Sequence, residues 1–338
     1  MHDWFEVLFG FSECSPEVVR ANVKIQNDQM LSGANGRQFK IGTLRTPTLG
    51  ELRASGKTAA AKLPGQLRVT NIIGDAGELH CIPENKGALF QVASQFNLLE
   101  MVGPEVTPEQ GITGYAFDGT QGPACAMAAA PATLYRNYFA PVGNQLGQTR
   151  DHQIDCLQDI GEHLGNENNQ LWRMSNGYAL DCPNGLVTIN QHLGQLSEDG
   201  LDALRQKLRI GIHTGIEVTL HDAPAGQIVS QAYCSALPVG YSNSPTAEWE
   251  PFARLILDAT YEATLAAAVI NAKQHGTNKV LLTKIGGGVF SNDLRWIYRA
   301  MERAFTKYEA TGLDVMIVNF SQIDQEAVDL ADSWNGRA

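Results

Sequence analysis

The chain has 338 residues, of which 43% are hydrophobic and 18% charged, a composition typical of a compact globular protein and not of a disordered or fibrous one. Its length suits one large α/β domain with additions, or two closely joined domains. The 25 basic and 36 acidic side chains give a net charge of −11, which excludes a basic field able to attract duplex nucleic acid.

The cysteines and histidines indicate no disulfide framework and no metal site. Six cysteines are spread along the chain without a Cys-x-x-Cys pair. His152 and Cys156 are one helical turn apart but have no further ligand nearby in the sequence. The first six residues lack the pattern of a signal peptide, and no run of 18 apolar residues occurs. We therefore expect a cytoplasmic protein with no membrane contact, no metal and no cofactor.

The first part of the chain is less regular than the rest. Residues 1–66 are polar and interrupted by Ser, Asn, Gly and Pro, so they are predicted to form an N-terminal extension packed on the core. Short apolar runs then predict buried strands at 67–73 and 88–93. An alanine-rich segment predicts one helix over 122–139 that starts at Pro123, because proline is favoured in the first helical turn.

An insert around residues 140–225 separates these elements from the last third of the chain. It is predicted to be rich in hairpins, with a helix at 200–207 and a strand at 208–212. Strands and helices then alternate, in the order strand 228–239, helix 251–273, strand 279–282, helix 294–308 and strand 313–318. This alternation predicts a three-layer α/β/α domain over 67–338, with a parallel or mixed sheet between helices.

The sharpest motif is a glycine-rich loop between the predicted strand at 279–282 and the helix at 294–308. Gly286, Gly287 and Gly288 allow backbone N–H groups to converge, and the following helix start adds further amides. The motif is neither a Walker loop nor a dinucleotide fingerprint. It predicts an anion cradle, with a simple glycine-rich turn as the alternative.

A second polar loop precedes the alanine-rich helix. It carries a carboxylate at Asp118, a hydroxyl at Thr120 and an amide at Gln121, followed by Gly122. Helix capping by Asp118 or Thr120 explains these residues without a ligand. Two amide-lined turns at strand ends of one sheet nevertheless favour a shared ligand site, because open sheets bind ligands beyond the carboxyl ends of their strands.

A third segment follows the predicted strand at 88–93. Its apolar run is interrupted by Gln95, Asn97 and Glu100. Amides at a strand end can hold sugar hydroxyls, and a desolvated carboxylate has the raised proton affinity that acid–base chemistry requires. A solvated carboxylate at a helix edge is the alternative for Glu100.

Together these motifs resemble the macrodomain superfamily, the ADP-ribose-binding fold that includes poly(ADP-ribose) glycohydrolases. The likeness runs from about residue 69 to 318. Gly74-Asp75 is similar to the first-strand motif whose carboxylate contacts the adenine amino group. Residues 88–97 stand where the family has its Asn-Ala-Ala-Asn strand end beside the distal ribose.

Two loops complete the resemblance. Residues 118–122 stand where the family has a glycine-rich loop around the pyrophosphate and distal ribose. Residues 286–292 are similar to the second phosphate loop, so the resemblance implies ligand contacts from Gly286–Gly288, Val289 and Asn292, with Phe290 packing on the distal ribose. The paired glutamates of the glycohydrolase signature are absent. The chain looks closer to a divergent branch that includes a bacterial effector macrodomain acting on ADP-ribosylated ubiquitin.

The resemblance implies a hydrolase that binds ADP-ribose on a modified protein, such as ubiquitin, and cleaves the glycosidic bond at the distal ribose. Asp118 is the first choice for the catalytic carboxylate and Glu100 the second. Asp75, Gln95, Asn97, Thr120, Gln121 and Gly122 would contact the ligand. The alternatives are a reader module that binds ADP-ribose without cleaving it and a hydrolase of free ADP-ribose derivatives.

Overall fold

The computed structural model describes residues 3–61 and 63–337. The first two of the six N-terminal residues that lack a signal-peptide pattern lie outside this range. Its centre is a seven-stranded sheet in the order β4-β11-β12-β6-β13-β14-β5. The strands are β4 (Thr43–Arg45), β5 (Arg68–Ile73), β6 (Leu89–Ala93), β11 (Gly211–Glu217), β12 (Ile228–Cys234), β13 (Lys279–Leu282) and β14 (Asp314–Asn319). The five strands from β12 to β5 are parallel, and β11 runs antiparallel to both of its neighbours, β12 and β4. The predicted α/β fold with a mixed sheet is confirmed.

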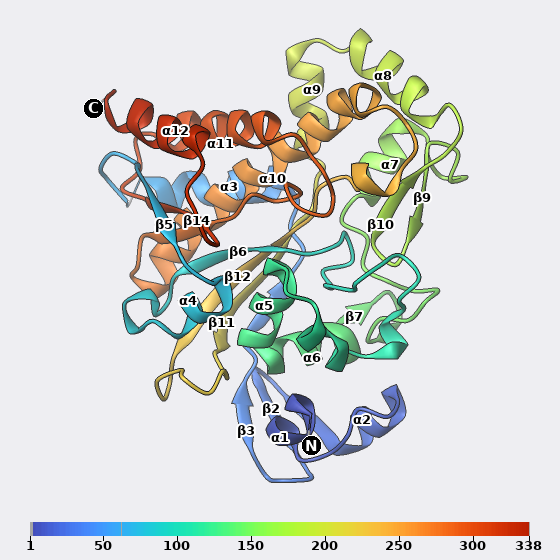
Figure 1. The fold of residues 1–338 in the computed structure, drawn as a ribbon, viewed down its shortest axis with the longest axis vertical. Helices are drawn as coiled ribbons and strands as arrows, with labels where there is room; N and C mark the ends of the chain where they lie inside the picture. Colours follow the sequence, from blue (N-terminus) through green and yellow to red (C-terminus); the bar gives the residue numbers. More distant parts are fainter. Residues whose placement is uncertain (1–2, 62, 338) are drawn as a thin grey trace.

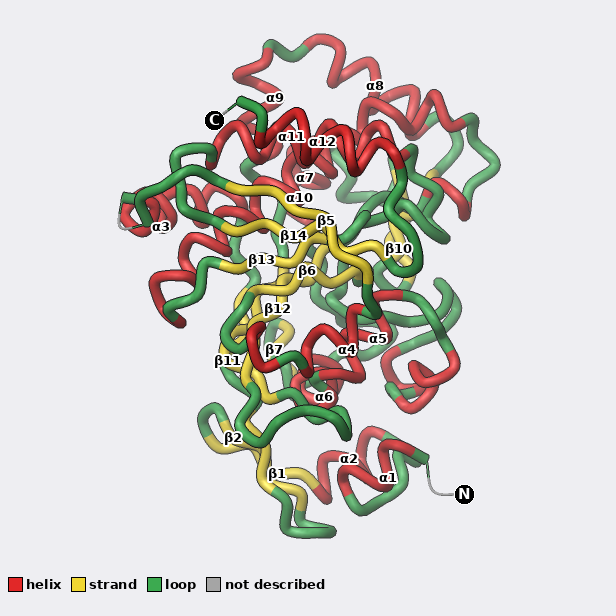
Figure 2. The backbone as a smooth tube through the Cα atoms, turned by 60° about the vertical axis from the view of Figure 1, so that its left-hand side comes forward, coloured by secondary structure: helices red, strands yellow, loops and turns green. Residues whose placement is uncertain are grey.

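Helices cover both faces of this sheet (Figures 1 and 2). One layer consists of α3 (Leu49–Ala60), α10 (Thr246–His275), α11 (Leu294–Tyr308) and α12 (Gln325–Asn335). The other contains α4 (Ala76–Cys81), α5 (Gln121–Ala128) and α6 (Ala130–Tyr138). Of the helices in the described part, α10 alone is long and apolar enough to cross a membrane, but 89% of its most apolar window is buried inside the protein. It is therefore placed as a core helix, packed on α3 and α11.

The alanine-rich segment differs from the prediction of one helix starting at Pro123. It forms two helices that are separated at Ala129, whose φ and ψ of −122° and 54° are not helical. Pro131 stands in the first turn of α6, where its missing N–H costs no hydrogen bond. Inside one continuous helix the same proline would remove a backbone hydrogen bond. The first helix begins at Gln121, two residues before the proline that the prediction relied on.

The N-terminal segment builds a small unit beside the sheet, at the bottom of Figure 1. It contains α1 (Trp4–Phe9), α2 (Pro16–Asn22) and an antiparallel sheet of β1 (Val23–Gln26), β2 (Gln29–Ser32) and β3 (Gln38–Lys40). Its apolar side chains share one buried cluster with residues of α6 and of the segment 99–115. β4 and α3, which also precede residue 67, belong to the main sheet and its helix layer.

The insert is more helical than the sequence predicts. It contains the hairpins β7 (Pro141–Val142) with β8 (Gln145–Leu146) and β9 (Trp172–Ser175) with β10 (Tyr178–Asp181), and the helices α7 (Gln158–Leu164), α8 (Gly185–Gln195) and α9 (Glu198–Arg205). The strand predicted at 208–212 is shifted to β11. The strand predicted to run to residue 239 ends at Cys234, because its neighbour β6 ends opposite it at Ala93.

Candidate functional site

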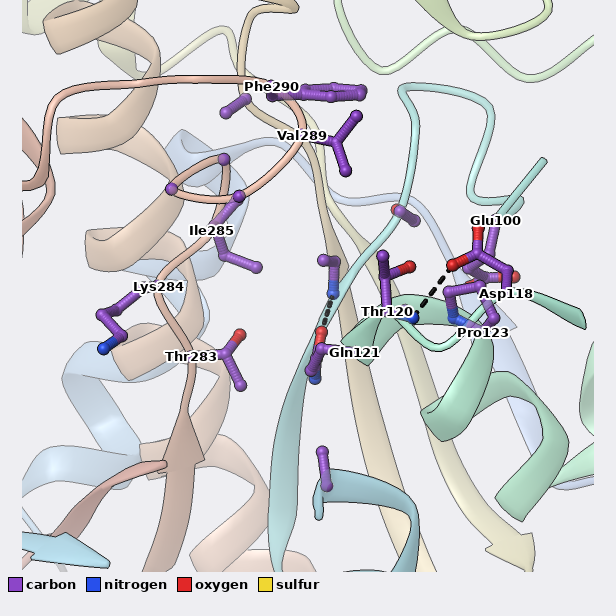
Figure 3. Close-up of a pocket in the computed structure, with 18 of the residues that line it drawn as sticks. Glu100, Asp118, Thr120, Gln121, Pro123, Thr283, Lys284, Ile285, Val289 and Phe290 are labelled. Carbon is purple, nitrogen blue, oxygen red and sulfur yellow. Dashed lines mark hydrogen bonds between the residues drawn. The ribbon is translucent and has the colours of Figure 1, made fainter. Parts of the chain in front are cut away.

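A cavity of about 770 Å³ opens at the carboxyl ends of the parallel strands. The turns that follow β5, β6, β13 and β14 all contribute to its wall, together with the loop that leads into α5. Strand ends of an open α/β sheet are where such folds bind ligands, and the volume suits a ligand the size of a dinucleotide. The two predicted loops face this one cavity (Figure 3).

The glycine loop, residues 286–290, keeps its shape through local hydrogen bonds. Gly286 has a φ of +80°, and a Cβ there would lie 2.5 Å from the Cβ of Ala236. The N–H of Gly287 donates to the carbonyl of Lys284 at 3.0 Å, and the N–H of Asn292 donates to the carbonyl of Gly286 at 2.9 Å. The loop is a tight turn, and its three glycines and Val289 line the pocket.

The Asp118 loop, residues 116–120, lies on the opposite side of the pocket from Val289 (Figure 3). The Asp118 carboxylate accepts a hydrogen bond of 2.9 Å from the N–H of Thr120 through Oδ1, and Asp118 lines the pocket. Thr120 is the N-cap residue of α5, but its hydroxyl makes no capping bond. Neither Asp118 nor Thr120 therefore caps α5 with its side chain. Asp118 instead closes a turn by bonding the backbone two residues further on.

The side chain of Gln121 bonds the backbone at the carboxyl end of β6. Its Oε1 accepts from the N–H of Ala93 at 2.8 Å, and its Nε2 donates to the carbonyl of Gln91 at 3.1 Å. Gly122 packs so tightly that a Cβ would lie 2.1 Å from the carbonyl oxygen of Ala93. No larger side chain, and so no carboxylate, fits at position 122 without moving β6.

Glu100 lies at the floor of the pocket in a buried ion pair. Both carboxylate oxygens accept from Nη2 of Arg136, at 2.9 and 3.0 Å, and both side chains are almost completely buried. Burial raises the pKa of Glu100, and the Arg136 guanidinium acts in the opposite direction. Arg136 also stacks on the ring of Tyr233, 3.8 Å from its centroid, and donates to the Tyr233 hydroxyl. The solvated alternative for Glu100 is wrong.

The amides predicted near the ribose are used by the protein itself. Gln95 lines the pocket, but its amide group bonds Met101 and Tyr178. Asn97 is fully buried away from the pocket, where it accepts from the N–H of Leu99 and donates to Gln153. Asn292 is also outside the pocket wall, because its Nδ2 donates to the carbonyl of Leu237 at 2.8 Å and steadies the glycine loop. The structure therefore does not bring Asn97 and Asn292 to the ligand site.

The other end of the pocket is formed where β5 and β14 end. Asp75 is the N-cap of α4 and accepts from the N–H groups of Gly77 and Glu78, which leaves Oδ2 without a capping bond. Phe320 follows β14 with 73% of its surface exposed and lines the same cavity. Lys284 is the one basic side chain among the described residues of the pocket wall, and it pairs with Asp324 at 2.8 Å.

An aromatic cluster forms the wall beside the glycine loop. The ring of Phe290 packs against Tyr178, from the insert, at 5.3 Å and against Tyr241 at 5.7 Å between centroids. Sequence reasoning missed both tyrosines and also Arg136, which no local pattern distinguishes. Lys284 and Phe320 had a signal, because each comes directly or almost directly after a predicted strand.

The rim of the pocket is unusually apolar. Nine large hydrophobic side chains are exposed in the described chain, and four of them, Val102, Phe117, Val289 and Phe320, line this cavity. Phe117 is 90% exposed and directly precedes Asp118. Exposed apolar side chains that gather at one place mark a surface that is covered in use. Within residues 3–61 and 63–337, no group of three or more His, Cys, Asp or Glu side chains is arranged to hold a metal ion.

No family model and no curated protein matches this chain. Among solved structures it is similar to poly(ADP-ribose) glycohydrolase from Deinococcus radiodurans in complex with ADP-ribose, with 10% sequence identity, coverage of 87% of this chain and 94% of that chain, and a TM-score of 0.45. It is also similar to poly(ADP-ribose) glycohydrolase from Thermomonospora curvata bound to the inhibitor ADP-HPD, with 13% identity, coverage of 95% and 96%, and a TM-score of 0.39.

Proposed function

We propose that this protein is an ADP-ribosyl hydrolase that binds ADP-ribose attached to a protein and cleaves the glycosidic bond at the distal ribose. The observation that carries the proposal is the meeting of a glycine cradle and a carboxylate-bearing loop across one cavity of dinucleotide size. The macrodomain-like order of these motifs in the sequence gives the ligand its identity.

The pocket offers a distinct partner to each part of ADP-ribose. The amides of Gly286 and Gly288 and the N-terminus of α5 would hold the diphosphate. Asp75 and the exposed ring of Phe320 lie together at the β5–β14 end, because Asn319 pairs with Ile73 in the register of these strands. A carboxylate acceptor next to an aromatic face suits an adenine ring with its amino group.

Asp118 is the carboxylate best placed to act on the distal ribose. It sits on the pocket loop, keeps one oxygen free of its turn hydrogen bond and is not paired with a cation in the described structure. In the proposed reaction Asp118 takes a proton from a water molecule whose oxygen attacks the anomeric carbon. The bond from that carbon to the acceptor breaks, the acceptor takes up a proton from solvent water, and Asp118 returns its own proton to solvent.

Glu100 is less suited to this step. Both of its oxygens are occupied by Arg136, so it cannot approach water without breaking a fully buried ion pair. Gly122, the next residue of the pocket wall, could not be replaced by an acidic residue, because β6 leaves no space for a side chain there. The remaining acidic side chain of the wall, Asp75, caps α4 at the opposite end.

The apolar rim supports a protein as the carrier of the ADP-ribose. Phe117 and Val102 flank the Asp118 side, where the distal ribose and whatever is attached to it would leave the pocket. A polypeptide segment can cover such apolar side chains favourably.

Asp118→Asn is the direct test, because the asparagine oxygen retains the turn bond to Thr120 while the negative charge is lost. We expect release of ADP-ribose from a modified protein, such as ADP-ribosylated ubiquitin, to fall about 100-fold or more. The calorimetric Kd for ADP-ribose should change less than about threefold. Asp199→Asn, at the exposed start of α9, is the matched control.

The same experiment separates the rival functions. A wild-type protein that binds ADP-ribose but releases nothing from any conjugate is a reader module. Faster turnover of ADP-ribose 1″-phosphate or O-acetyl-ADP-ribose than of protein conjugates indicates an enzyme of free derivatives. Absence of ADP-ribose binding in calorimetry refutes the proposal as a whole.

A further inference from the structure

One carboxylate of the N-terminal unit binds the segment that leads to Asp118. Glu13 accepts from the N–H of Ile112, 2.9 Å from Oε2 and 3.0 Å from Oε1, although the two residues are 99 positions apart. Its Oε2 also accepts from the N–H of Thr113 at 2.7 Å and from the Thr113 hydroxyl at 2.6 Å. A carboxylate with several charge-assisted bonds to consecutive backbone groups fixes the position of those groups.

The surroundings of Glu13 are shaped for this contact. Gly111 has a φ of +83°, and a Cβ there would lie 2.5 Å from the Glu13 carboxylate, so the chain approaches as closely as only glycine allows. The indole Nε1 of Trp4 donates to the carbonyl of Thr113 at 2.9 Å. The hydroxyl of Tyr138, on α6, donates to Oε1 of Glu13 at 2.7 Å.

The anchored residues begin the short 3-10 helix at Thr113–Phe117, and Asp118 follows it. Tyr115 in that helix is buried, and its hydroxyl accepts from the N–H of Glu100 at 2.9 Å. The N–H of Asp118 donates to the carbonyl of Tyr115 at 3.2 Å. The Glu13 carboxylate therefore fixes Thr113, and the 3-10 helix that begins there determines where Asp118 lies, five residues later.

We propose that Glu13 is a positioning residue for Asp118 and that the N-terminal unit is a working part of the site. The inference rests on the proposed function. A displacement of about 1 Å in a group that must address one atom of a bound substrate is enough to slow a reaction by orders of magnitude. The glycine loop lies on the other side of the pocket and has no contact with Glu13, so ligand affinity is expected to survive.

Two variants isolate the loop contact from the general stability of the unit. Glu13→Gln replaces an acceptor by an amide group whose N–H₂ faces the donors of Ile112, Thr113 or Tyr138. Tyr138→Phe removes a hydrogen bond from the same carboxylate but leaves the bonds to the loop intact. Both changes weaken the attachment of the N-terminal unit, and only the first changes what Ile112 and Thr113 bind.

We expect Glu13→Gln to lower kcat for ADP-ribose release at least tenfold, with a change of less than threefold in the Kd for ADP-ribose. Tyr138→Phe should lower kcat less than threefold at a similar loss in Tm. Equal kcat values in the two variants would overturn the inference. If Glu13→Gln does not fold, Thr113→Val takes its place and should also be slower than Tyr138→Phe.

Hydrogen exchange keeps this test separate from the test of the proposed function. If the wild-type protein releases no ADP-ribose, the proposed hydrolase is wrong, and the anchor is then judged by the exchange rates of the amides in 112–118. Faster exchange there in Glu13→Gln than in Tyr138→Phe supports the anchor. The same rates in both variants refute it.

Discussion

The glycine loop and the Asp118 loop border the same pocket but are held by different kinds of contact. The turn of the glycine loop is closed by its own neighbours, since the bonds of Gly287 to Lys284 and of Ser291 to Gly288 span three residues each. Its far end is joined to residues 237–240 by the bonds of Asn292 to Leu237 and of Gly240 to Phe290. The Asp118 loop takes its position from Glu13 and, through Tyr115, from the backbone of Glu100. The bonds that close the glycine loop are local, whereas those that hold the Asp118 loop come from residues far away in the chain.

The residues packed beneath the two loops also differ, being apolar under the glycine loop and polar under the Asp118 loop. The glycine loop leads from β13 into α11, whose buried face is apolar. Below the Asp118 loop lies a buried polar layer in which Arg136 pairs with Glu100 and donates to Tyr233, the Tyr233 hydroxyl donates to Gln231, and Gln231 donates to His80. Buried polar networks fix a geometry firmly only while every member keeps its partner.

The largest effect on ADP-ribose affinity is expected from a change that strains the glycine loop. Gly286→Ala places a Cβ 2.5 Å from Ala236 and 2.8 Å from Nδ2 of Asn292, at a φ of +80°. Strain of about 1–3 kcal/mol will be relieved by a shift of the loop, which moves the amides proposed to bind the diphosphate. Calorimetry should show a loss in ADP-ribose affinity of at least tenfold.

Gly194→Ala is the matched control, because nothing lies within 4 Å of a Cβ at that position on α8. It should bind ADP-ribose like the wild-type protein. Wild-type affinity in Gly286→Ala would mean that the ligand does not depend on the shape of the glycine loop, and the contrast between the two loops would lose its functional meaning.

The contrast also explains what the sequence could predict. The strand at 279–282 and the helix at 294–308 were predicted at their observed bounds, because apolar periodicity and glycine spacing are local signals. Gly286–Gly288 were placed correctly at the turn between them. The partner of Glu100 was not predictable, since Arg136 lies 36 residues away on α6 and only the packing of α6 against the sheet brings the two together.

Two asparagines that the sequence analysis assigned to the ligand site have structural roles instead. Asn97 and Asn292 have the polar side chains expected at a ligand site, but both satisfy backbone groups inside the protein. A buried amide can stabilise a turn as readily as it can bind a sugar, and the sequence does not distinguish the two uses. Glu13 had no visible signal at all, because its partners lie about 100 residues further along the chain.

A smaller effect, on stability and not on affinity, is expected from the polar layer when the pH falls. Burial lowers the pKa of His80 to about 4. Its Nδ1 lies 2.6 Å from the carbonyl of Ala76, and Gln231 donates to its Nε2, so the neutral ring has its proton on Nδ1. In the unfolded chain the same ring titrates near 6.5.

Between pH 6.5 and about 4 the unfolded state therefore binds more protons than the folded state. The free energy of unfolding decreases as the pH is lowered through this range. The slope from one such histidine is at most ~1.4 kcal/mol per pH unit. His213, whose pKa burial lowers to about 3, adds to it. Urea melts at several pH values should show a shallower slope for His80→Leu. Val187→Ala, which shortens an exposed side chain without a titratable group, should leave the slope unchanged, and an unchanged slope in both variants would contradict the assignment.

The smallest effect is expected at the rim, where the two loops meet the solvent. Phe117 is 90% exposed on the Asp118 side, so Phe117→Ala removes little packing from the free protein. If the ring contacts the polypeptide that carries ADP-ribose, kcat/KM for a modified protein should fall about threefold to tenfold, the value of part of a buried phenyl ring. The Kd for free ADP-ribose should not change, because the ring lies outside the proposed nucleotide contacts.

Leu146→Ala is the control for this last change, since Leu146 is 62% exposed and lies away from the pocket wall. It should leave both measurements as they are in the wild-type protein. An equal loss of ADP-ribose affinity in Phe117→Ala would assign the ring to the nucleotide and not to its carrier. A loss confined to poly(ADP-ribose) would instead show that a polymer passes over the rim, because the Asp118 side is where any group attached to the distal ribose must leave.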